Sequence, residues 1–122
     1  MVIEIRDGSE VPIYLQLRNQ IVSGISAGAL EPGEQLPTVR ALAAELGVNA
    51  MTVSKAYQLL KQEGFIVSDR RSGARVRERG PQDGTLTRES REQLRVLAAE
   101  AKARGMSRVD FLAMCGGFFG EE

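Results

Sequence analysis

Short polar side chains between Asn49 and Lys55 form the most suggestive chemical pattern in the sequence. The run NAMTVSK combines an amide, two hydroxyls and an ammonium group with small side chains. Asn can pair with adenine through two hydrogen bonds, Ser and Thr can bond to several bases, and short side chains let a helix approach a groove closely. Because a polar face at a helix start is usually only solvated surface, this interpretation depends on the elements around it.

A second candidate is a cluster of positive charge. Between Asp69 and Arg79, five arginines stand against two acidic residues, which gives this stretch a net charge of +3. Arginines on a hairpin can lie on phosphates or enter a minor groove, and Gly73 permits a tight tip. Arg40 could reach a phosphate from the other side. Arginine-rich hairpins also serve simply as soluble surface, so charge alone leaves both interpretations open.

Composition excludes most enzyme classes. The 122 residues, of which 43% are hydrophobic, suffice for one compact domain plus an appendage. Histidine is absent and Cys115 is the single cysteine, so the usual zinc sites and imidazole chemistry are missing. No glycine-rich phosphate loop is present either. We therefore expect neither an enzyme nor a cofactor, and because the formal charge is zero, DNA affinity must come from local charge.

The sequence also predicts a cytoplasmic location without a membrane partner. Residues 1–6 lack the basic and apolar regions of a signal peptide, and the longest apolar runs fall far short of the roughly 20 residues that span a bilayer. One cysteine cannot form an internal disulfide, and Cys115 is expected to be buried and inert.

Apolar periodicity predicts three helices that would position these residues. The first begins at Pro12 and ends at Gly28; the second follows Thr38 and ends at Gly47; the third follows Asn49 and ends at Gly64. Only two residues separate the second stop from the third cap, a spacing typical of a helix-turn-helix. The residues expected to face inward are Tyr14, Leu17, Ile21, Ile25, Val39, Leu42, Ala43, Leu46, Val53, Ala56, Tyr57 and Leu60.

Two short strands, residues 65–68 and 74–77, are predicted to follow as a hairpin with a turn over residues 69–73. The order helix, short turn, polar-faced helix and basic hairpin is far more specific than any of its parts. It predicts a mainly α fold with a small β-hairpin, a winged helix-turn-helix, at residues 1–79.

A change of character marks the C-terminal part. Residues 80–86 are expected to be a linker, followed by a helical segment at residues 87–122. Thr87 and Ser107 can each cap a helix, and the pair Gly116-Gly117 is expected to end the last one. Two helices can hardly bury their own apolar side chains, so we expect a homodimer interface formed by Leu94, Leu97, Ala101, Phe111, Leu112, Cys115, Phe118 and Phe119. The alternative is that these helices fold back on the winged domain of the same chain.

Residues 12–76 also resemble the GntR-type winged-helix regulators. The matching runs include Pro12-Ile13-Tyr14, residues 28–40 (GALEPGEQLPTVR), residues 46–49 (LGVN), residues 52–57 (TVSKAY) and residues 63–66 (EGFI). The resemblance implies DNA contacts by Arg40, by Asn49 and Thr52 on the recognition helix, and by Arg71 and Gly73 at the wing tip.

This chain differs from many GntR-type members at Ala50 and Ser54, where they carry basic residues. We therefore expect Met51, Thr52 or Lys55 to take over part of the base readout. The full predicted DNA-contacting set is Thr38, Arg40, Asn49, Ala50, Met51, Thr52, Ser54, Lys55, Arg70, Arg71, Ser72 and Gly73.

The short C-terminal part, about 40 residues after the wing, is similar to that of the YtrA-like branch and is too small for a separate ligand-binding domain. That resemblance implies a dimeric repressor of its own operon and of transporter genes, bound to an inverted repeat in double-stranded DNA. The competing interpretation is a winged helix that contacts a protein partner. A small-molecule effector, if the protein has one, is expected between the C-terminal helices or at their junction with the wing.

Overall fold

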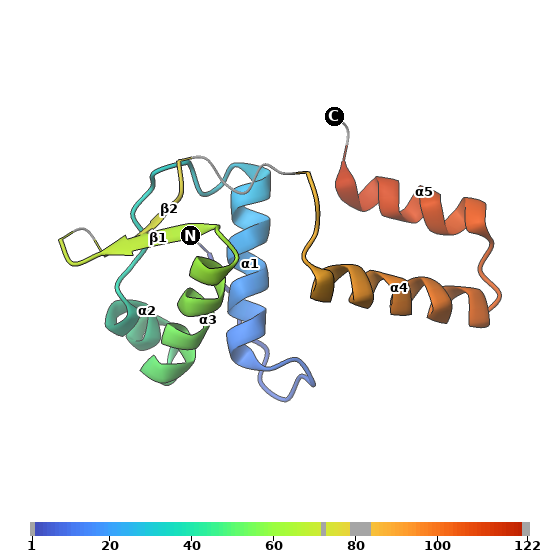
Figure 1. The fold of residues 1–122 in the computed structure, drawn as a ribbon. Helices are drawn as coiled ribbons and strands as arrows, with labels where there is room; N and C mark the ends of the chain where they lie inside the picture. Colours follow the sequence, from blue (N-terminus) through green and yellow to red (C-terminus); the bar gives the residue numbers. More distant parts are fainter. Residues whose placement is uncertain (1, 72, 79–83, 121–122) are drawn as a thin grey trace. The chain divides into compact units, whose positions relative to one another are not determined.

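The computed structural model describes residues 2–71, 73–78 and 84–120. Its elements are α1 (Ile13–Ala27), α2 (Val39–Leu46), α3 (Ala50–Gln62), β1 (Ile66–Asp69), β2 (Gly73–Val76), α4 (Arg88–Ala103) and α5 (Arg108–Phe119) (Figure 1). The chain divides into two compact units, residues 1–83 and 84–122. The prediction of a mainly helical fold with one small hairpin is confirmed.

The turn between α2 and α3 is built from three consecutive residues with distinct roles. Gly47 ends α2 in the left-handed conformation (φ 69°), and the Val48 N–H donates to the Ala43 carbonyl at 3.0 Å. Asn49 then caps α3, its Oδ1 accepting from the Met51 N–H at 2.8 Å. This turn is short because one residue closes each helix end, and it produces the predicted helix-turn-helix.

A single apolar core holds α1, α2, α3 and the hairpin together. The core side of α1 is provided by Leu17 and Ile21, both fully buried, and α1 and α2 both pack on α3 (Figure 1). The inward positions predicted for the three helices all belong to the core or pack against it. The buried set is Leu17, Ile21, Leu30, Leu36, Leu42, Ala43, Val53, Ala56, Tyr57, Leu60, Ile66 and Val76.

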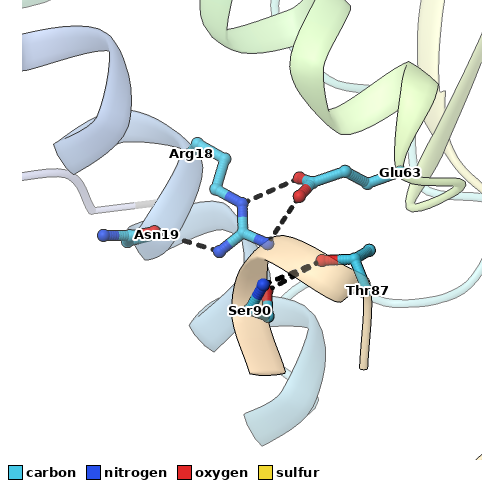
Figure 2. A network of polar contacts seen from close by, with 5 residues as sticks. All are labelled: Arg18, Asn19, Glu63, Thr87 and Ser90. Atoms are coloured by element: carbon cyan, nitrogen blue, oxygen red, sulfur yellow. Dashed lines mark hydrogen bonds and ion pairs between the residues drawn. The ribbon is translucent and has the colours of Figure 1, made fainter. Parts of the chain in front are cut away.

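An ion pair fastens α1 to the end of α3. The Arg18 guanidinium donates to both carboxylate oxygens of Glu63, at 2.9 and 3.1 Å, and to the Asn19 side-chain oxygen at 3.0 Å (Figure 2). The charged partners are only about one-fifth exposed, and the guanidinium carbon lies 5.7 Å from the centre of the Phe65 ring. This two-point contact ties the C-terminal end of α3 to α1.

Each strand of the hairpin lies one residue nearer the turn than predicted, with no change in the pairing between the strands. The antiparallel register pairs Ile66 with Val76 and Asp69 with Gly73, and Arg70 and Arg71 lie in the turn that follows β1. Gly73 has a φ of +69°, the left-handed conformation that such hairpin turns often use. Asp69 closes the turn by accepting the Arg71 N–H at 2.8 Å.

Backbone hydrogen bonds tie the hairpin to the segment before α2. The Leu36 N–H donates to Ala74 at 2.9 Å, the Gly33 N–H donates to Val76 at 2.9 Å, and the Val76 N–H returns a bond to Glu34 at 2.8 Å. Because of these bonds, the hairpin is attached to the segment that leads into α2, and α2 in turn packs on α3.

The second unit is a pair of helices, α4 and α5, that run in opposite directions and contact each other (Figure 1). Thr87 and Ser107 cap them as predicted, and Figure 2 shows the Thr87 hydroxyl against Ser90. The prediction that Gly116-Gly117 ends the last helix is wrong. Helix α5 continues to Phe119, and the Gly116 carbonyl accepts from the Gly120 N–H at 3.1 Å. Within the described residues, none of the helices has the length and apolar character to cross a membrane.

Candidate nucleic-acid interface

The N-terminal half of α3 presents the predicted polar face to solvent. Asn49, Ala50, Met51 and Lys55 are exposed, and Thr52 and Ser54 are half-buried at the edge of this face. The opposite side of the helix is the buried stripe of Val53, Ala56, Tyr57 and Leu60. The N-terminal half of the helix therefore separates core residues from candidate base-contacting residues.

Two predicted contacts have a structural task as well. The Asn49 side-chain oxygen accepts the Met51 N–H, and the Thr38 hydroxyl oxygen accepts the Ala41 N–H at 3.1 Å. A two-bond pairing of Asn49 with adenine uses that same oxygen, so its second lone pair would have to accept from the base while the cap bond is kept. The Thr38 hydroxyl keeps its hydrogen and can still donate it to a phosphate.

Lys55 is held in place by an aromatic ring from another helix. Its ammonium nitrogen lies 4.1 Å from the centre of the Tyr14 ring, within the range of a cation–π contact. Tyr14 and Lys55 line one shallow hollow together with Met51, Thr52, Ser54 and Gln58. The helical spacing predicted only a core position for Tyr14. It could not predict the contact with Lys55, because no local pattern in the sequence links α1 to the start of α3.

The wing carries fewer free cations than its composition implies. Arg70 and Arg71 are exposed in the hairpin turn, whereas Arg75 is half-buried and lies 3.8 Å from the carboxylate of Asp69. Arg77 is exposed just after β2. The predicted residues Ser72 and Arg79 lie outside the described residues. On the opposite edge, Arg40 is exposed on the first turn of α2.

A second hollow lies between the start of α2, the middle of α3 and the hairpin. Its lining includes Thr38, Ser54, Tyr57 and Lys61. The Tyr57 hydroxyl donates to the Pro37 carbonyl at 2.8 Å, and burial raises the pKa of Tyr57 to about 12. This bond links the recognition helix directly to the residue before the α2 cap, so it positions Thr38 relative to α3.

Replacing Tyr57 by phenylalanine is expected to lower the free energy of unfolding by about 1 kcal/mol, because the Pro37 carbonyl loses its partner. A pH series separates this effect from simple packing. The pKa of Tyr57 is raised in the folded state, so its contribution is complete below pH 10 and is lost as pH rises toward 12. Urea unfolding should show the two proteins converging over that range; a difference independent of pH would contradict the assignment.

Comparison with known proteins shows which family has this arrangement of helices and hairpin. The family model for bacterial regulatory proteins of the gntR family matches residues 12–76, which span helices α1 to α3 and the hairpin. The chain belongs to the GntR family. It is therefore a DNA-binding transcription regulator, and the interpretation as a protein-contact module is set aside. GntR proteins are regulators and not enzymes, as the composition predicted.

Two GntR relatives share the short form of this chain. The transcriptional repressor YtrA of Bacillus subtilis is 36% identical over 107 residues, which cover 85% of this chain and 82% of the relative. The crystallised YtrA of Sulfolobus acidocaldarius is 40% identical, with a TM-score of 0.65 over 84% of this chain and 99% of that one. The resemblance to the YtrA-like branch is therefore confirmed.

A third GntR-type neighbour has been solved on DNA. The DNA-binding domain of AraR in complex with operator ORX1 is 27% identical, with a TM-score of 0.56 over 62% of this chain and 98% of that one. The share of this chain that it covers is close to the size of the unit formed by α1 to α3 and the hairpin.

Proposed function

We propose that this GntR regulator is a homodimeric repressor that binds an inverted-repeat operator, with its recognition helices in two major-groove half-sites. The observation that carries the proposal is the exposed apolar surface of α4 and α5. Neither helix has a buried residue, and Phe118 and Phe119 are 82% and 83% exposed. Apolar surface of this extent usually marks an interface, and a second copy of the same chain is the simplest partner.

The proposed pairing surface has two parts. Leu94, Leu97 and Leu112 are each about half exposed, on the same two helices as the two phenylalanines. Ala101, Phe111 and Cys115 are half-buried, and Ala101 and Phe111 line a hollow formed by α4 and α5. In this proposal the first part contacts the partner, and the second keeps the two helices of one protomer together. Residues 87–122 form the pairing segment and residues 1–79 the DNA-binding domain.

The proposed DNA surface joins α2, α3 and the hairpin turn. Arg40, Arg70 and Arg71 contact phosphates or a minor groove, while the exposed start of α3 faces the bases. The remaining proposed contacts are Thr38, Asn49, Ala50, Met51, Thr52, Ser54, Lys55, Ser72 and Gly73. The repressor name of the Bacillus YtrA relative supports repression as the outcome. The proposed targets, the chain's own operon and transporter genes, follow from the resemblance to the YtrA-like branch. The proposed location is the cytoplasm.

In this proposal, a small effector would act by changing how the C-terminal segments pair, because their pairing sets the spacing of the two recognition helices.

Selection of duplexes from a random pool at physiological salt, followed by sequencing, tests the proposal. We expect an inverted repeat with half-sites about one helical turn apart. Enrichment of a single half-site would contradict the dimer but keep sequence-specific binding. Binding only at low salt, with no enrichment, would contradict a specific operator altogether, since it reports phosphate attraction alone.

A further inference from the structure

Met51 is an apolar side chain placed where solvent exposure is hardest to explain. It is the second residue of α3 and is 78% exposed. Among the described residues between 12 and 78, it is the one large hydrophobic side chain left exposed. Single exposed apolar side chains are common on protein surfaces. The position of this one in the first turn of α3, on the face proposed to meet DNA, gives its exposure meaning.

The surroundings of Met51 restrict what that partner surface can be. Its backbone N–H is fixed by the Asn49 cap at 2.8 Å, so the side chain leaves the first turn of α3 in a defined direction. It shares one hollow with Thr52 and with Lys55, whose ammonium group lies over the Tyr14 ring. A thioether neither neutralises a phosphate nor donates a hydrogen bond, and Lys55 beside it already supplies the cation.

On the major-groove edge of a duplex, the apolar feature is the C5-methyl group of thymine. An unbranched, flexible Met side chain at the start of a recognition helix is long enough to reach a base edge and adapts its shape to a methyl group. We infer that Met51 is a specificity-determining residue that packs on the methyl group of one thymine in each operator half-site. This inference rests on the proposed function, since it requires α3 to lie in a major groove.

Uracil substitution tests the contact, because uracil differs from thymine only by the missing methyl. The probe is the duplex most enriched by the wild-type protein from the random pool, remade with uracil at one thymine at a time. We expect one thymine per half-site at which uracil raises Kd about fourfold, the effect of losing one buried methyl. In Met51→Ala, the same replacement should change Kd by less than about 1.5-fold, whereas Met51→Leu should keep most of the sensitivity.

The control is Gln62→Ala, which alters an exposed residue at the other end of the same helix and should match the wild type on every probe. Sensitivity that persists unchanged in Met51→Ala, or its absence at every thymine, would overturn the inference while sequence-specific binding stands. If the random pool yields no enriched duplex, the proposed operator function fails first and the inference falls with it. Loss of folding in Met51→Ala is excluded by an unchanged unfolding midpoint, which the exposure of the side chain predicts.

Discussion

Aspartate at both Leu97 and Leu112 is expected to convert the protein from a dimer to a monomer and to raise Kd for a full inverted repeat at least about 100-fold. Both side chains are about half exposed on the helical pair, so the change should not disturb the core of the DNA-binding unit, whose buried residues all lie between 17 and 76. Two linked half-sites bind tightly because the second contact is effectively intramolecular. Four carboxylates placed in an apolar interface remove that linkage.

Sedimentation velocity and titration of two duplexes, one with the full repeat and one with a single half-site, measure this effect. The half-site affinity should stay within about twofold of the wild type, because no DNA contact has changed. Gln93→Asp adds one negative charge per chain, half of the change in the double variant, at an exposed polar position of α4 and is expected to remain dimeric. A double variant that stays dimeric would show that these positions do not carry the pairing. A monomer that keeps full affinity would show that pairing does not set the affinity for the repeat.

Local signals predicted the recognition unit well, because each of its boundaries is set by one residue with a clear preference. Thr38, Gly47 and Asn49 each act through their own side chain or φ angle, so the sequence alone locates both ends of α2 and the start of α3. The inward stripe of α3 followed equally from its spacing. What the spacing does not reveal is that the Asn49 side-chain oxygen already accepts a cap bond from the Met51 N–H, which restricts how Asn49 can hydrogen-bond to a base.

Non-local contacts account for most of what was missed. The Tyr57 bond to Pro37, the Tyr14 contact with Lys55 and the pairing of residues 33–36 with β2 join segments whose separation carries no periodic signal. The error at Gly116-Gly117 has a different origin. Glycine in a helix costs only about 1 kcal/mol, so a pair of glycines lowers the preference without ending the helix. Phe118 and Phe119 consequently lie on α5 and not beyond it.

Charge counting overestimated the wing for a reason visible in the hairpin. Arg75 lies beside Asp69, so the two charges largely offset each other, and the Arg75 Nε is buried in the fold. The arginines free to meet DNA in the described part of the hairpin turn are Arg70 and Arg71. Together with Arg40 on α2, they form a small basic set on a protein with no net formal charge. Few substitutions should therefore have a large effect on Kd for DNA.

Replacing Arg40, Arg70 and Arg71 together by alanine is expected to raise Kd for the selected operator about 100-fold near 0.15 M salt. If each arginine neutralises one phosphate, each contributes about 0.9 to the slope of log K against log salt, which corresponds to about fivefold in affinity at that concentration. The slope should therefore decrease by about 2.7, and the loss should be far smaller at high salt. Titrations at four or more salt concentrations measure both quantities.

A charge-matched variant distinguishes local contacts from net charge. Alanine at Arg88, Arg91 and Arg104 removes the same three charges from exposed positions of the C-terminal unit. Because surface charges separated by more than about 8 Å from a phosphate are largely screened at this salt, these changes should leave both the affinity and the slope nearly unchanged. Equal losses in the two triple variants would mean that overall charge, and not the wing and the start of α2, attracts the duplex.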